Sequence, residues 1–237
     1  MGARLKINLA LLAVFAMGLA ASSYFARDSV YRDAREEVLR SAMVMMEASA
    51  SMRHYTVAQV RPALPYDRKA FLPQSVPAFA ATEIMTGLRK KYPDYVYKEA
   101  ALNPTNLRNR AVEWESDLVN AFRNDSSRSE IVGERDTPTG RSLYLARPIK
   151  IDDSACLACH TTADMSPPAM VKIYGTVNGY GWKLNEVVGA QIVSIPMDLA
   201  LQHANRALAT LIACLTGVFA ALLLAVNLLL TPLLTKA

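Results

Sequence analysis

The segment Ser142–His160, with the sequence SLYLARPIKIDDSACLACH, joins a strand-like stretch directly to two cysteines and a histidine. Its first ten residues carry the aliphatic and aromatic side chains typical of a strand. Residues 130–134 form a second candidate strand, connected to it through a turn that contains Pro and Gly, and residues 186–195 form a closing strand. No helical crossover separates these strands, so we predict that they pair antiparallel.

The two cysteines have a spacing that carries specific chemistry. Cys156 and Cys159 are separated by two residues, and His160 follows at once. Two thiols at this spacing can add across the two vinyl groups of haem, and the adjacent histidine then lies below the iron. The motif therefore predicts one covalently attached haem c, held by Cys156 and Cys159, with His160 as an axial iron ligand.

A disulfide, a zinc site and a thioredoxin-like redox pair each account for less of this motif. A structural disulfide suits an oxidising compartment but gives no role to His160. A zinc site needs further ligands, and only His54 and His203 remain, without a second pair of cysteines. A thioredoxin-like redox pair belongs in a βαβ unit near the start of a chain, and no such unit is predicted here.

Two uncharged runs indicate membrane helices. Residues 7–26 and 207–235 are each long enough to cross the ~30 Å hydrocarbon layer as a helix. Arg4 and Lys6 precede the first run, and Lys236 follows the second. Because short basic flanks stay on the cytoplasmic side, we expect both termini in the cytoplasm and the segment between the runs in the periplasm.

These expectations divide the chain into three parts. Residues 1–26 are a transmembrane anchor, residues 27–206 a periplasmic domain and residues 207–235 a second inner-membrane helix. A cleavable signal peptide is the alternative for the first part, since small residues follow its apolar centre. The periplasmic part is exported in either case.

Charge and motif content argue against further classes of function. Of the 26 Lys and Arg residues, Arg4, Lys6 and Lys236 lie outside residues 27–206, which are therefore close to charge balance with the 21 acidic residues. No basic stripe suited to nucleic acid is present. The sequence also has no hydrolase triad, phosphate loop or paired carboxylate site, so we expect that the protein is not an enzyme.

The remaining pattern completes an α+β domain. Residues 27–60 lack Gly and Pro and have apolar residues at three- and four-residue intervals, which predicts one long helix, continuous with the first membrane run. Residues 78–91 and 111–123 are further candidate helices, and residues 92–100 form a candidate strand.

An ordered set of motifs resembles a known family, the periplasmic haem-c domains with a PAS-like core. These occur alone in cyanobacteria and as sensor input modules of bacterial chemoreceptors and histidine kinases. The resemblance covers roughly residues 30–196, and it implies a PAS-like antiparallel sheet with a long N-terminal helix and haem between helix and sheet. The residues that carry it are Asn103-Pro104-Thr105-Asn106, Trp114-Glu115, Arg147-Pro148, Cys156–His160 and Val188-Gly189-Ala190.

The second iron ligand is where the sequence departs from this family. Some members use a cysteine on the early helix, but this chain has none before Cys156. We predict His54 as the second axial ligand, because on a regular helix it shares a face with Ala50 and Val57. Met52 is the runner-up, since thioethers also bind haem iron.

Two strand residues are candidates for contact with the haem itself. Arg147 could pair with a propionate as a charge-assisted donor, and Tyr144 could line the haem edge. The alternatives are a solvated strand charge for Arg147 and a half-buried packing residue for Tyr144.

Two functions follow from these expectations. In the first, the haem senses redox state or a small gas and moves the early helix, with output through a membrane-embedded partner or a homodimer. In the second, the protein is a membrane-tethered cytochrome that carries electrons to or from an inner-membrane complex. The resemblance favours sensing. Few residues follow the second span, which favours either electron transfer or a sensing subunit whose output lies on another chain.

The predicted topology is testable with reporter fusions. A fusion at Ala237 should be active only with a cytoplasmic reporter, and a fusion at Asp125 only with a periplasmic one, because the basic flanks retain both termini inside. Periplasmic activity at Ala237 would overturn the predicted orientation.

Overall fold

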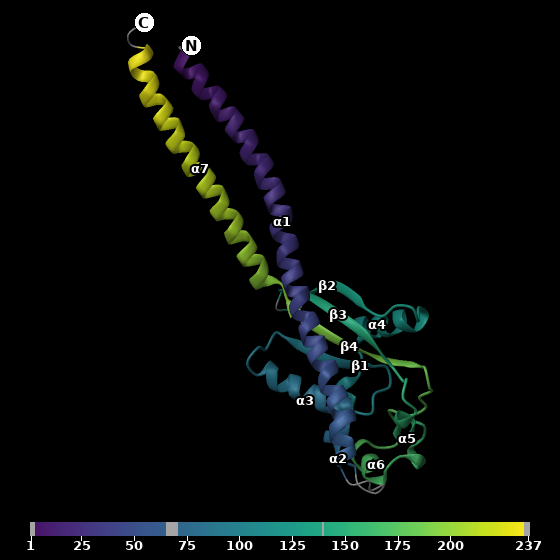
Figure 1. Cartoon of the computed structure of the whole chain (residues 1–237). Coiled ribbons are helices and arrows are strands. Elements are labelled where there is room, and N and C mark those ends of the chain that lie inside the picture. The colour runs from purple at the N-terminus through teal and green to yellow at the C-terminus, as the bar shows by residue number, and fades with distance from the viewer. Residues whose placement is uncertain (1–2, 65–70, 139, 235–237) are drawn as a thin grey trace. The chain divides into compact units, whose positions relative to one another are not determined.

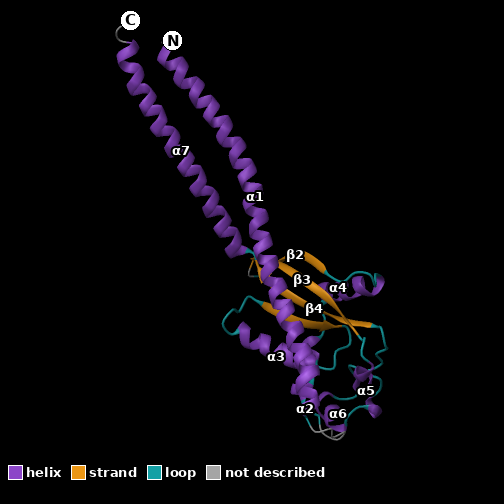
Figure 2. Cartoon of the chain, viewed as in Figure 1, coloured by secondary structure: helices purple, strands orange, loops and turns teal. Residues whose placement is uncertain are grey.

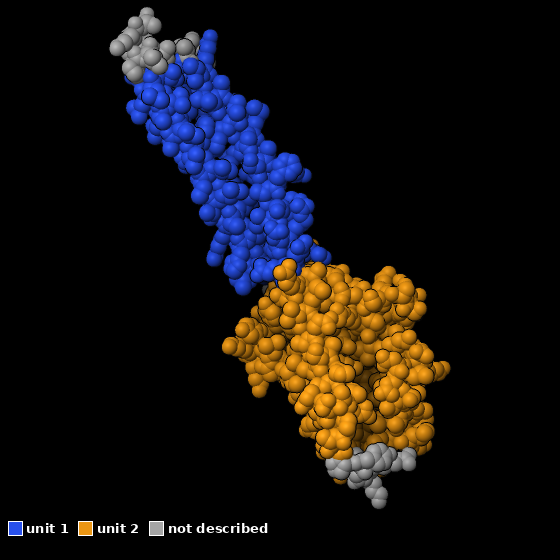
Figure 3. All heavy atoms as spheres, in the orientation of Figure 1, with its two compact units in different colours: residues 1–37, 197–237 blue, residues 38–196 orange. Residues whose placement is uncertain are grey.

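The computed structural model describes residues 3–64, 71–138 and 140–234, which form two compact units (Figure 3). One unit combines residues 1–37 with residues 197–237, and the other comprises residues 38–196. Residues 1, 2 and 235 of the predicted spans, and the flanking Lys236, lie outside the described residues.

The first unit is built from two long helices, α1 (Ala3–Tyr55) and α7 (Asp198–Leu234), whose N-terminal and C-terminal ends lie near each other (Figure 1). Both are long and apolar enough to cross a membrane, and they contain the two uncharged runs. Only the part of α1 up to residue 37 belongs to this unit.

Contacts at successive levels hold α1 and α7 antiparallel. Phe15 and Phe219 stack with their ring centroids 3.9 Å apart. Nearer the chain ends, the side-chain amides of Asn8 and Asn227 donate to each other at 3.0 and 3.1 Å. Amide hydrogen bonds of this kind stabilise helix pairs in an apolar medium, where an unpaired amide is costly.

The described residues of the second unit form one four-stranded antiparallel sheet in the order β1-β4-β3-β2 (Figure 2). The strands are β1 (Val96–Ala101), β2 (Ile131–Thr137), β3 (Gly140–Lys150) and β4 (Val187–Pro196). The predicted antiparallel pairing of an α+β domain is confirmed. The expected strand over residues 92–100 begins only at Val96, because Tyr92–Tyr95 form a turn.

Helix α4 (Glu113–Asn124) covers one face of the sheet. Its Leu118, Val119 and Phe122 are buried against the side chains of Ala146 and Ile192. Glu115 of α4 also accepts a 2.6 Å hydrogen bond from Lys98 of β1. The apolar contact forms the core on that face.

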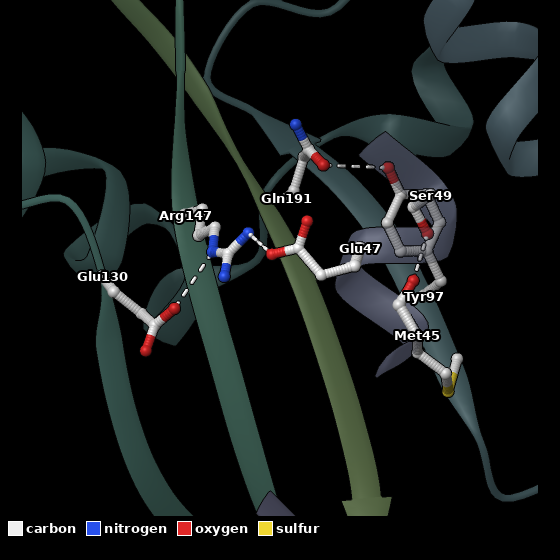
Figure 4. Close-up of polar contacts among 7 residues, drawn as sticks. All are labelled: Met45, Glu47, Ser49, Tyr97, Glu130, Arg147 and Gln191. Atoms are coloured by element: carbon white, nitrogen blue, oxygen red, sulfur yellow. Dashed lines mark hydrogen bonds and ion pairs between the residues drawn. The ribbon is translucent and has the colours of Figure 1, made fainter. Parts of the chain in front are cut away.

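The opposite sheet face carries polar contacts to α1 (Figure 4). Arg147 of β3 donates from Nη1 to Glu47 of α1 at 2.7 Å and from Nε to Glu130 at 3.0 Å. The buried Tyr97 of β1 lies on the same face, within 3.5 Å of Gln191 on β4. The ion pair between Arg147 and Glu47 thereby holds α1 against β3, although the two elements are far apart in sequence.

The C-terminal end of α1 widens before it stops. Residues Thr56–Val60 form a π-helical turn, and α2 (Arg61–Ala63) follows it. Pro62 has no N–H and its ring crowds the preceding turn, which accounts for a local departure from the α-helical ladder. The buried Thr56 hydroxyl donates to the Met52 carbonyl at 2.8 Å within the same turn.

Of the remaining helices, α3 precedes β1, and α5 and α6 lie between β3 and β4. Helix α3 (Pro77–Arg89) agrees with the predicted helix, whereas α5 (Leu157–His160) and α6 (Pro168–Tyr174) had no counterpart in the prediction. Short 3-10 turns cover Pro73–Ser75, Leu107–Asn109, Ser154–Cys156 and Ala163–Met165.

Candidate functional site

The ring of His160 is held from two sides. Its Nδ1 lies 2.7 Å from the carbonyl oxygen of Gly179, and its plane stacks on Trp182 with centroids 3.9 Å apart. Since a carbonyl oxygen only accepts, Nδ1 carries the proton and Nε2 has the free lone pair. No described group is hydrogen-bonded to Nε2, so this nitrogen is available to a metal.

Burial lowers the pKa of His160, while its hydrogen bond to the Gly179 carbonyl acts in the opposite direction. The net shift favours the neutral imidazole near pH 7, which is the form that coordinates iron. The Thr105 hydroxyl lies 3.4 Å from the same Nδ1, too far to compete with the carbonyl.

The two cysteines precede His160 on a tight helical turn. Asp153 caps this turn by accepting from the backbone N–H of Ala155 at 2.8 Å. Cys156 and Cys159 are free, half-buried thiols. Burial raises the pKa of both, and the Asp153 carboxylate raises that of Cys156 further.

Both thiols and His160 line one cavity of about 600 Å³ on the α1 side of the sheet. Its walls come from the end of α1 and the described chain from there to the start of α3, from β1 and the loop after it, from β3 and β4, and from the segment between β3 and β4. Apolar side chains line much of it, namely Val57, Phe71, Ile149, Met170 and Val188. A largely apolar cavity with two thiols and one free imidazole nitrogen fits a haem bound through thioether links and one axial histidine.

A buried charge pair forms part of the cavity wall. Arg53 of α1 donates to Glu99 of β1 at 2.6 Å, and the Tyr97 hydroxyl donates to the second oxygen of Glu99 at 2.8 Å. The Glu99 side chain is only 3% exposed. Burial and the Glu99 carboxylate raise the pKa of Tyr97, so the phenol stays protonated and remains a donor.

The two candidates for the second axial ligand differ in their surroundings. His54 lines the cavity together with Arg53 of α1, Val57 of the π-helical turn and Arg61 of α2. Its side chain is exposed at the cavity rim rather than packed into the core. Met52 is half-buried and does not line the cavity that the described residues form.

Among the residues that the structure describes, those that line the cavity do not include the two predicted haem contacts, Arg147 and Tyr144. Arg147 is bound by Glu47 and Glu130, as Figure 4 shows. Tyr144 lies on the opposite face of the sheet, where its ring packs 5.5 Å from that of Trp114. Their odd separation along β3 places them on opposite faces.

Several residues around the site had no assigned role in the sequence analysis. Trp182, Gly179, Arg53 and Arg61 contact either His160 or the cavity. Arg61 lies seven residues after His54, and on a regular helix this spacing puts both residues on the same side, which was a signal in the sequence. Trp182 and Gly179 reach His160 only through tertiary folding.

Comparison with known proteins shows which family the chain matches. A model of the Tll0287-like family matches residues 31–196. The chain is also similar to the crystal structure of the cyanobacterial haem protein Tll0287, with 17% identity and a TM-score of 0.54, over 68% of this chain and 95% of that one. This likeness confirms the predicted α+β, PAS-like fold. A comparison with curated proteins gave no match.

Proposed function

Because this chain belongs to the Tll0287-like family, we propose that it is a membrane-anchored c-type haem protein that senses redox state or a small gas in the periplasm. Its two apolar helices would hold it in the inner membrane, with both termini in the cytoplasm. The relative named above is a haem protein, which supports the proposed cofactor.

One observation carries this proposal. The thiols of Cys156 and Cys159 and the imidazole of His160 line the same cavity, and the hydrogen bond at Nδ1 leaves Nε2 for the metal. Haem bound here would supply an iron that changes oxidation state and can take a small gas at a coordination position. The cysteines would hold the macrocycle covalently, and His160 would be one axial ligand.

The α1 wall of the cavity suggests how such a change would be transmitted. Arg53 and His54 line the cavity, and both belong to α1, the helix that also contains the first apolar run. A change in the ligand that α1 contributes would alter the forces on this helix near the Arg53–Glu99 ion pair. This connection favours sensing over simple electron transfer.

Covalent attachment is the first test. Purified full-length protein should keep its colour after acid–acetone extraction and give a haem-staining band, because thioether links survive denaturation. Replacing Cys156 and Cys159 by Ser should abolish the stain, while Cys214→Ser, outside the motif, should leave it intact. Haem that is freely extracted from the parent protein would contradict the proposal.

The second axial ligand can be identified by its spectrum. His54→Ala should convert a low-spin ferric spectrum to a high-spin one without loss of attached haem, because one iron ligand is removed. His203→Ala is the matched control and should leave the spectrum unchanged. An unchanged low-spin spectrum in His54→Ala would exclude His54, and a weak far-red ferric band would then indicate Met52.

The two functions differ in the lability of the sixth position. Adding carbon monoxide or nitric oxide to the reduced protein should shift the Soret band if a gas displaces the α1 ligand, since an electron carrier usually keeps two firm ligands. No shift at saturating gas would exclude gas sensing. Redox sensing and membrane-tethered electron transfer would then remain. A structural change in α1 on reduction of the haem would support redox sensing, and its absence would support electron transfer.

A further inference from the structure

We infer that Asn103 is a positioning residue for His160, because it holds the peptide that receives the histidine's hydrogen bond and thereby tunes the iron bound on the opposite nitrogen. This inference rests on the proposed function, since it concerns the strength of His160 as an iron ligand. Asn103 lies in the segment between β1 and the turn Leu107–Asn109, far from His160 in sequence.

Asn103 holds the backbone on both sides of the Gly179 carbonyl. Its Oδ1 accepts from the N–H of Gly179 at 3.2 Å, and its Nδ2 donates to the carbonyl of Tyr180 at 3.3 Å. The two partners also fix which way the amide points, because an N–H requires the oxygen and a carbonyl requires the nitrogen. The Gly179 carbonyl, which His160 contacts at 2.7 Å, lies between these two anchored groups.

Gly179 itself allows this close approach. Its φ of +87° is a conformation that residues with a side chain rarely adopt. A Cβ at this position would collide with the Thr105 hydroxyl and lie 2.7 Å from the Thr105 Cα. The loop that carries Gly179 therefore packs directly on the Asn103–Thr105 segment, and the amide of Asn103 fixes their register.

The rest of the loop is bound to the histidine segment by backbone groups. The N–H of Trp182 donates to the His160 carbonyl at 3.2 Å, and that of Gly181 donates to the Thr161 carbonyl at 3.0 Å. These two hydrogen bonds do not involve Asn103, so they should keep the loop near His160 when the Asn103 side chain is removed. Loss of the Asn103 side chain should therefore leave the loop in place but release the orientation of the Gly179 peptide.

A defined direction follows for the reduction potential. A strong hydrogen bond from Nδ1 raises the basicity of the coordinating nitrogen, which stabilises the more highly charged ferric iron. A weaker bond should favour the ferrous state and raise the potential. Mutating a hydrogen-bond partner of a metal ligand typically changes metal affinity or activity by about 10-fold or more. We therefore expect roughly a tenfold change in the ferric-to-ferrous ratio, which is about 59 mV for one electron.

The test compares redox titrations of haem-loaded, full-length protein. Asn103→Ala should retain covalent haem and show a raised midpoint potential. Asn178→Ala is the matched control, because Asn178 lies in the same loop but its side chain accepts from Arg110 at 3.0 Å, whereas the hydrogen bonds to the Gly179 N–H and the Tyr180 carbonyl come from Asn103. Its potential should equal that of the parent protein.

Each result has one meaning. A raised potential in Asn103→Ala alone supports the inference, whereas an unchanged potential in that variant, or equal shifts in both variants, overturns it. If Asn103→Ala does not retain haem, Asn103→Leu replaces it, since that side chain has a similar volume and no charge but makes neither hydrogen bond, and its potential should rise in the same way. A parent protein without covalent haem contradicts the proposed function as well, which separates that failure from failure of the Asn103 inference alone.

Discussion

The alternation of side chains across the antiparallel sheet is the constraint on which the second unit depends. Cross-strand partners point to the same face, so the register that pairs Arg147 with Gln191, and Glu99 with Gln191, gives all three residues one face. That face meets α1 and forms part of the cavity. The other face receives α4, so the apolar core and the candidate site are built on opposite faces of the same strands.

Because the apolar core lies on the α4 face, the α1 face can carry polar groups. The core under α4 is closed by apolar side chains such as Phe122 and Ile192. On the opposite face, Glu99 is buried but satisfied by Arg53 and Tyr97, so its desolvation is offset by two hydrogen bonds. A buried charge pair beside the cavity would also influence any iron bound there, because charges act strongly where water is excluded.

The histidine is controlled by a different part of the chain. Its Nδ1 meets the Gly179 carbonyl, its ring meets Trp182, and neither contact uses the sheet. A backbone carbonyl is a fixed acceptor that cannot change its protonation state, which leaves the free lone pair on Nε2. The motif thus identifies the candidate ligand, His160, and the loop before β4 determines how its ring is oriented.

Sequence reasoning reached the elements with strong local patterns. The long helix of α1 and the strands β3 and β4 follow from their periodicity, and the pairing of β2 with β3 follows from their short connection. The segment between β3 and β4 is long and contains α5 and α6, which the sequence did not predict. It did not separate Tyr144 from Arg147, although the strand period of two places them on opposite faces. The contacts of Asn103 and Trp182 with the site depend on loop packing across long sequence separations, for which a single sequence contains no periodic signal.

The central claim is that Cys156, Cys159 and His160 form the attachment site of a single haem. The most direct measurement is a peptide mass map of the full-length chain, produced together with a c-type haem maturation system and alkylated before digestion. One haem is expected on the peptide that contains residues 156–160, with neither cysteine of that peptide alkylated. A peptide without haem, with both cysteines alkylated or joined in a disulfide, would contradict it.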